Sequence, residues 1–565
     1  MDRRSALVLL VVFGIGVFLA GLDLIITAVA LPSILVDLVD PTGGSVWIEL
    51  RKASWIINAY LLAYVVTMPL AGRLADLWGA RRLFMGALSV FVVGSALAGA
   101  SQNLDQLIAA RIVQGVGGGV LVPVATAAAS HLFEGHDRPR ALGVIGALTF
   151  LGMAAGPFVG AAILGGVHVE GTVERLGLEG GSLAAVLAPA WRWIFYVNVP
   201  IGIVAIALAW AASAGWETPR RPGRVDVIGA ALFTIALATG LIGLTLLGSS
   251  DIAGLGVDPA VVSAALFAIA AVATVLTILR DLRQETPFLE VRLFRSVSFS
   301  SAALVSLLTG YAFATAIIGG AVFVDRVLYG GPDDQRLALG ALAGLTAVGA
   351  LVSGFAVRLL SLRLVTLVGL VASAGALLAM STWTASITIE QVALALGVFG
   401  FGFGLTVTPR STAAVESAGR SSFGIASAVV TVSRMIGMAI GLAILTAYGS
   451  TAIDRLYNEL YATPEAYQAI IPEDLRDRPL RDPFVVEALE DWASREAAGI
   501  MVGLFVVAAG VTIAAIPPGL ALGRRRRRLE VQEASAAASS GEAAAGGPPG
   551  GTREGIERGE PTVVL

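Results

Sequence analysis

Long apolar stretches alternate with short polar ones along most of the chain. Fourteen of the apolar stretches have about twenty residues, which is the length that an α-helix needs to cross the hydrocarbon core of a bilayer. They lie near residues 6–31, 54–73, 83–102, 105–127, 140–165, 194–214, 226–247, 259–280, 297–323, 337–357, 364–384, 389–409, 422–447 and 498–520. The pattern predicts an all-α membrane protein with fourteen transmembrane helices.

The composition agrees with this prediction. Hydrophobic residues fill 56% of the 565 positions and charged residues only 14%, against about 25% charged residues in soluble proteins. The apolar run that begins at Ala6 is too long for the core of a signal peptide, so we expect a first span that stays in the protein. The chain has no cysteine and only three scattered histidines, which offer no metal site, and we expect no cofactor.

Basic residues mark every second predicted loop, as they do in the cytoplasmic loops of membrane proteins. These residues are Arg3 and Arg4; Arg73, Arg81 and Arg82; Arg138 and Arg140; Arg220, Arg221 and Arg224; Arg280, Arg283, Arg292 and Arg295; Arg358 and Arg363; Arg410 and Arg420; and Arg524 to Arg528. Acidic residues prevail instead in the loops 248–258 and 448–497. The alternation predicts a multi-pass protein of the cell membrane with both termini in the cytoplasm.

The hairpin between the second and third predicted spans has the most specific pattern. It holds Gly72, Asp76, Gly79, Arg81 and Arg82 at fixed spacing. Glycine permits a tight turn, and an aspartate there can accept hydrogen bonds from arginines or from a helix N-terminus. The pattern resembles the loop between spans 2 and 3 of the major facilitator superfamily of transporters, which implies a latch on the cytoplasmic side. A plain basic loop that anchors the chain at the membrane surface is the alternative.

The fifth predicted span contains Gly152, Gly156, Pro157 and Gly160. Small residues four apart allow two helices to approach closely, and proline bends a helix because it lacks a backbone donor. This run resembles the antiporter motif of the same superfamily, which is associated with export rather than import. A helix-packing face without any transport role is the simpler interpretation.

Three charged residues lie inside predicted spans, where charge is costly unless it is paired or faces water. Asp23 in the first span is the candidate proton carrier, because burial makes a carboxyl group take up a proton more readily. Arg111 resembles the span-4 arginine that the superfamily associates with proton coupling. Arg434 lies too deep to reach either interface, so we expect it to interact with Asp23 or with substrate in some state. Purely structural roles for Asp23 and Arg111 remain open.

The segments that open the second and sixth spans also resemble fourteen-span drug:proton antiporters, whose fold is two six-helix bundles with two helices between them. We therefore expect a bundle at 1–214, two linker helices at 215–296, a second bundle at 297–520, and a basic and then disordered cytoplasmic tail at 521–565. Asn58, Tyr60 and Tyr311 are candidate polar contacts to substrate.

The predicted external loop 448–497 begins with a helical pattern, so we expect the preceding helix to extend beyond the membrane and a second helix near 483–497 to return. This loop and the surroundings of Arg434 resemble the mycobacterial triacylglyceride exporters of the superfamily, which implies an envelope lipoprotein partner. Leu148 and Thr149 occupy the region where that branch carries a glutamate. A solvated loop without a role in transport is equally compatible.

The leading hypothesis is a proton-coupled exporter of hydrophobic or amphipathic compounds, such as drugs, that works by alternating access. Export of triacylglyceride-like lipids to the cell envelope is the alternative, and a receptor or scaffold that kept the fold is a third. No nucleophile, metal or nucleotide motif indicates an enzyme, and the basic run before the tail indicates anionic lipids rather than nucleic acid. The expected partners are protons, the bilayer, and small hydrophobic molecules or lipids.

Overall fold

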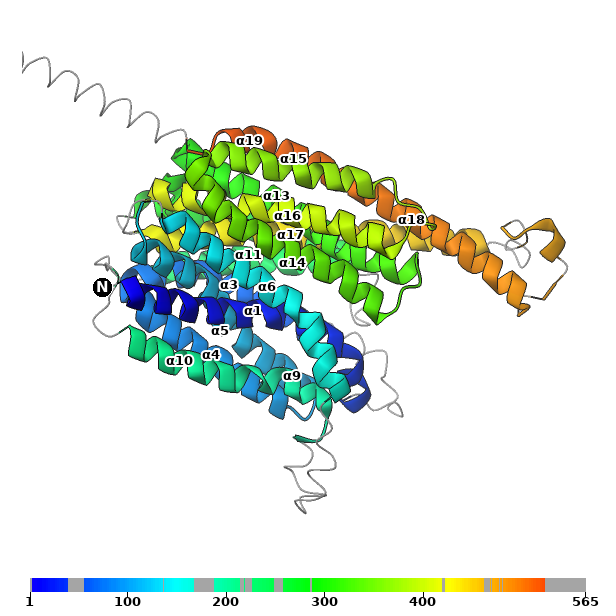
Figure 1. Cartoon of the computed structure of the whole chain (residues 1–565), viewed down its shortest axis with the longest axis horizontal. Helices are drawn as coiled ribbons and strands as arrows, with labels where there is room; N and C mark the ends of the chain where they lie inside the picture. The colour runs from blue at the N-terminus through cyan, green and yellow to red at the C-terminus, as the bar shows by residue number, and fades with distance from the viewer. Residues whose placement is uncertain are drawn as a thin grey trace, which may run out of the picture. The chain divides into compact units, whose positions relative to one another are not determined.

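The computed structural model describes residues 3–523 except 39–54, 136, 167–186, 214–217, 219–225, 248–257, 285–286, 419–421, 462–467, 469, 477 and 480. Fourteen helical segments in the described part are long and apolar enough to cross a membrane, which confirms the prediction (Figure 1). The run Arg524–Arg528, the tail that follows it, and the loop arginines 220, 221 and 224 lie outside the described residues.

Six spans form what we call the first bundle. They are α1 (Arg3–Leu38), α3 (Trp55–Trp78), α4 (Ala80–Ala100), α5 (Leu104–Leu132), α6 (Asp137–Gly166) and a sixth made of η1 (Ala190–Arg192), α9 (Trp193–Tyr196) and α10 (Asn198–Ala212). Helix α1 packs along α6, while α3 and α4 both pack against α5. Each of these six spans overlaps a predicted apolar stretch, and the bounds differ by several residues.

Helices α11 (Val227–Leu247) and α12 (Pro259–Arg283) follow and pack chiefly against each other. Most side chains of α12 are exposed in the protein and most of those of α11 are half-buried, as expected for helices that face lipid. Arg280 closes the pair by a two-pronged ion pair with Asp226, at 2.8 Å from its Nη2 to Oδ1. These hydrogen bonds hold the pKa of Asp226 below its ordinary value.

Six further spans form the second bundle. After η2 (Val291–Arg295) come α13 (Val297–Arg326), α14 (Pro332–Leu359), α15 (Leu362–Met380), α16 (Ile389–Ala418), α17 (Phe423–Tyr461) and, after η5 (Glu473–Leu475), α18 (Pro483–Ala514) with the short α19 (Ile516–Leu520). Helix α16 packs against α14 and α15, and α13 packs against α17. The arrangement repeats that of the first bundle, in which α5 packs against α3 and α4.

The two bundles meet through two helix pairs, α6 with α14 and α3 with α17. Glycine permits both approaches: a Cβ on Gly143 would lie 2.9 Å from the Ala350 carbonyl oxygen, and one on Gly72 would lie 2.6 Å from that of Gly424. Both close contacts lie toward the end at which α3 ends and α4 begins, which we call the hairpin face. The bundles are therefore tightly closed on this face.

Three helix boundaries depart from simple hydropathy. Helix α16 continues through Pro409 to Ala418, so the expectation that Arg410 lies in a loop is wrong; a membrane helix tolerates one missing proline donor because neighbouring groups satisfy the freed carbonyl. Helix α17 continues to Tyr461, and α18 begins at Pro483, capped by the Asp482 carboxylate at 3.0 Å from the Phe484 nitrogen. Both extended helices are as predicted for the 448–497 segment.

Candidate functional site

A buried ion pair joins α1 and α5, the first and fourth spans of the chain. Asp23 on α1 is fully buried, and its Oδ2 lies 2.5 Å from Nη1 of Arg111 on α5, which is 1% exposed. Gln114, one helical turn after Arg111, donates to Asp23 Oδ1 at 2.9 Å and accepts from Arg111 Nη1 at 2.7 Å. The three side chains form a closed hydrogen-bonded triangle in which both carboxylate oxygens are occupied.

Neighbouring helices complete this triangle. Ser95 on α4 accepts from Gln114 at 2.8 Å and from Asn198 on α10 at 3.1 Å. The Nε of Arg111 donates to the Ile56 carbonyl oxygen at 3.3 Å, and its guanidinium carbon lies 3.9 Å from the centre of the Tyr60 ring. Because five helices contribute, removal of either charge would leave the other buried without a partner, which is strongly destabilising.

The hairpin motif lies where the bundles meet. The Asp76 carboxylate accepts backbone hydrogen bonds from Gly424 at 3.0 Å and Ile425 at 3.2 Å, at the N-terminus of α17. A helix N-terminus attracts negative charge, because its first amide groups have no partner within the helix. Asp76 on the first bundle therefore binds the start of a helix in the second bundle.

Glycine makes this contact possible on both sides. A Cβ on Gly424 would lie 2.7 Å from Asp76 Oδ1 and would collide with the Gly72 carbonyl oxygen. Gly79 adopts φ 89° between α3 and α4, a conformation that other residues rarely take. Arg81 is half-buried and Arg82 exposed just beyond this turn. Three of the five predicted motif positions, Gly72, Asp76 and Gly79, thus have a direct structural reason, and the two arginines lie beside them at the hairpin face.

The glycine motif of the fifth span holds α6 against α1. A Cβ on Gly152 would collide with the Phe18 carbonyl oxygen, one on Gly156 would lie 3.0 Å from Cβ of Ile25, and one on Gly160 would lie 3.1 Å from a side-chain carbon of Ile26. Pro157 lies within α6, in the same stretch. The motif therefore fixes the helix that carries Asp23.

The structure does not bring Arg434 to Asp23. Arg434 lies on α17 and is 9% exposed, with its guanidinium carbon 5.5 Å from the centre of the Phe150 ring on α6. The Asp23 carboxylate forms its ion pair with Arg111 instead. An approach of Arg434 to Asp23 stays a prediction for another conformation.

The three candidate substrate contacts lie apart. Tyr60 stacks on Tyr64, with ring centres 5.7 Å apart, and belongs to the Asp23 network through Arg111. Tyr311 is buried on α13 in the second bundle, and Asn58 is half-buried near the start of α3. Only Tyr60 touches a charged group of the network described above.

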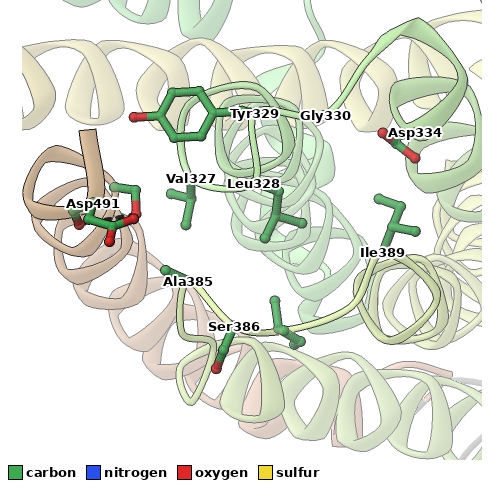
Figure 2. Close-up of a pocket in the computed structure, with 11 residues that line it drawn as sticks. Val327, Leu328, Tyr329, Gly330, Asp334, Ala385, Ser386, Ile389 and Asp491 are labelled. Atoms are coloured by element: carbon green, nitrogen blue, oxygen red, sulfur yellow. Dashed lines mark hydrogen bonds between the residues drawn. The ribbon is translucent and has the colours of Figure 1, made fainter. Parts of the chain in front are cut away.

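A separate open pocket of about 460 Å³ lies at the face opposite the hairpin. Figure 2 shows Asp491 of α18 and Asp334 of α14 on its two sides, with Tyr329 at its rim. Tyr329 donates to the Glu490 carbonyl oxygen at 3.1 Å, and burial raises the pKa of its phenol. The pocket is remote in the fold from Asp23 and lies beside the start of α18.

Sequence reasoning missed Gln114, Ser95, Asn198 and Arg410 as members of buried polar clusters. A glutamine one turn after a buried arginine is a detectable signal, since residues three apart share a helix face. The serine and asparagine give no such signal, because they come from helices whose packing only the structure provides. Arg410 was missed because the predicted span ended at the preceding proline, Pro409.

Comparison with known proteins adds sequence relatives. Residues 13–442 match the model of the Major Facilitator Superfamily. A triacylglyceride transporter of Mycolicibacterium hassiacum is 30% identical over 467 residues, which cover 80% of this chain and 81% of that protein. The multidrug transporter protein MdtP of Bacillus subtilis is 26% identical over 467 residues, with 80% and 77% covered.

Solved structures share the fold at low identity. The human organic anion transporter MFSD10 has a TM-score of 0.57 at 14% identity and covers 91% of this chain and all of its own. A bacterial homologue of the human lysosomal transporter Spinster, in an inward-facing conformation, has a TM-score of 0.54 at 15% identity, with 92% and 98% covered.

Proposed function

We propose that this chain, which belongs to the major facilitator superfamily, is a proton-coupled exporter of hydrophobic or amphipathic compounds that works by alternating access. The observation that carries the proposal is the buried pair of Asp23 and Arg111 inside the first bundle. Charged groups are rare at such depth and mark ion or proton pathways in membrane proteins. Transporters of this type bind substrate near the midplane between two related bundles.

In the proposed cycle Asp23 carries the proton. A proton on its carboxyl group would cancel the charge that holds Arg111, and the glutamine and serine around it offer alternative hydrogen bonds. Loss of the pair would remove the ion pair that links α1 to α5, which would favour a shift of the two helices relative to each other. Arg434 is the candidate partner of Asp23 after such a shift, since both lie on helices that reach the space between the bundles.

The hairpin face is the cytoplasmic side in this proposal, with both termini in the cytoplasm and the chain in the cell membrane. The positions of Arg73, Arg81, Arg82, Arg138 and Arg140 near that face support the orientation. Asp76 and the glycines around it then form the inner latch, which is closed in the present conformation. Glycines 152, 156 and 160 with Pro157 hold α1 to α6 during the cycle.

Efflux of a fluorescent dye from proteoliposomes under an imposed pH gradient tests the proposal. Asp23→Asn should abolish proton-driven efflux, and because it also leaves Arg111 without its anion, folding of the purified variant is checked by its melting temperature before transport is compared. Asp37→Asn is the matched control, because it removes a carboxylate of the same helix whose pair with Arg192 lies at the opposite face. Full efflux by Asp23→Asn would remove Asp23 from the mechanism.

Lipid export is the second candidate. The relatives named as triacylglyceride transporters favour it. The end of α17 and the start of α18 also favour it, because these helices offer a surface for an envelope lipoprotein. Shortening the 448–497 segment should then reduce transport of a labelled glyceride more than transport of the dye. Equal effects on both cargoes would argue against a lipid-specific role for this segment.

A further inference from the structure

Two buried arginines of the second bundle have no carboxylate partner. In the described part of the chain, no ion pair includes Arg410, which is 2% exposed, or Arg434, and the Arg434 Nε has no hydrogen-bond partner. Arg111 and Arg192 of the first bundle differ, since Arg111 pairs with Asp23 and Arg192 with Asp37. A buried guanidinium without an anion is costly, so both residues call for one.

Both arginines contact one turn of α13, Arg410 through its side chain and Arg434 through its backbone. Arg410 Nη1 donates to Oγ1 of Thr309 at 2.6 Å, and the next residue, Gly310, packs against the Arg434 backbone so closely that a Cβ would collide with its carbonyl oxygen. The positive charge of Arg434 acts electrostatically on the Arg410 guanidinium. Like charges repel strongly in a medium of low dielectric constant, and a shared anion would reverse this repulsion.

An aromatic cluster lies beside both guanidinium groups. The centre of the Phe403 ring lies 5.1 Å from the Arg410 guanidinium carbon. The same ring centre is 4.5 Å from that of Phe313 and 5.5 Å from that of Phe150. The Arg434 guanidinium carbon lies over the face of the Phe150 ring. Because Phe150 belongs to α6 and the others to the second bundle, the cluster lies at the contact between the bundles, where a transported molecule would pass.

We propose that Arg410 and Arg434 bind the head group of an amphipathic anion, a carboxylate or a phosphate, whose aliphatic part packs on Phe150, Phe313 and Phe403. Arginine suits this task, since its planar fork matches the oxygens of both head groups. The inference rests on the proposed export function and names the substrate class for it. Neutral glycerides would use the aromatic cluster alone and bind more weakly.

Equilibrium binding to the full chain in nanodiscs of neutral phosphatidylcholine tests this site. Radiolabelled oleate is the probe, and lysophosphatidate, monoolein and inorganic phosphate are the competitors. Lysophosphatidate should displace oleate, monoolein should do so about tenfold less well, and inorganic phosphate should be weaker than both because it has no chain. Competition by monoolein equal to that by lysophosphatidate would overturn the role of the charge, and tight binding of inorganic phosphate would overturn the role of the aromatic cluster.

Variants locate the effect. Arg434→Gln and Arg410→Gln should each weaken oleate binding about tenfold and leave monoolein binding nearly unchanged, whereas Arg434→Lys should retain part of it. Arg363→Gln is the control, because this half-buried arginine of α15 donates to the Leu522 carbonyl oxygen, away from the aromatic cluster. Unchanged oleate binding in both glutamine variants would refute the site. If a variant does not fold, the competition series on the unaltered chain still decides.

The measurement is made at one pH without a gradient, so it does not depend on proton coupling. Loss of head-group selectivity with intact pH-driven dye efflux would refute the anion site and leave the export function standing. Selective oleate binding without any pH-driven efflux would do the reverse.

Discussion

Replacement of Asp76 by asparagine should open the hairpin face. The carboxylate accepts two backbone hydrogen bonds at the N-terminus of α17, from Gly424 and Ile425. Hydrogen bonds to a charged group contribute about 1.5–3 kcal/mol each, and the helix end adds up to about 1 kcal/mol. Asparagine keeps one acceptor but loses the charge, so we expect the closed arrangement to lose about 2–3 kcal/mol. The ratio of closed to open molecules should then fall about 30- to 150-fold.

Spin labels on the two bundles can measure this shift. The chain has no native cysteine, so Trp78→Cys and Leu359→Cys can be labelled without other changes; both positions are exposed at the hairpin face, one on each bundle. Pulsed electron resonance should reveal a longer distance population in Asp76→Asn. Asp226→Asn is the control, because it breaks a comparable ion pair that joins only α11 and α12.

An unchanged distance distribution in Asp76→Asn would refute the latch. The same conclusion would follow if the control variant opened the face equally, since the effect would then come from general loosening of the protein.

Two further predictions concern packing and pH. Gly424→Ala should open the same face even with Asp76 intact, because its Cβ would collide with the Gly72 carbonyl oxygen; the same labelled pair checks it, and a distance distribution like that of the parent would contradict it. The pair of Asp226 and Arg280 should stabilise the protein above the unfolded pKa of aspartate, about 3.9, and this contribution should be lost as pH falls through the depressed folded pKa. Melting temperatures of the parent and Asp226→Asn should therefore differ at pH 6 and converge in acid, and a constant difference would exclude the linkage.

Hydropathy and loop charge were enough to predict the span count, because a membrane helix must satisfy its own backbone and so leaves a long apolar signature. The hairpin and glycine motifs were found for a similar reason, since close backbone approach requires glycine at fixed spacing. The ion pairing was not predictable. Asp23 and Arg111 are 88 residues apart, and Arg434, not Arg111, was predicted from the sequence as the partner of Asp23.

For Arg410 the prediction was wrong, because the sequence places in a loop an arginine that the structure buries. Hydropathy ended that span at Pro409, because proline followed by arginine has the composition of a loop, and the buried arginine was assigned to the membrane surface. The helix continues because Arg410 finds Thr309 and the face of Phe403 within the bundle. Burial of a charged side chain depends on the neighbouring helices, and one helix's sequence does not record them.

Helix α17 is a single element of 39 residues, which makes it about 58 Å long. Its first residues are gripped by Asp76, and its last ones stand outside the apolar span that ends at Leu445. If this helix tilts as a rigid body, it pivots about a point within its apolar span. A tilt that moves the start of α17 away from the first bundle would then move Tyr461 in the opposite direction. A conformational change at one membrane surface would in this way be transmitted to the other.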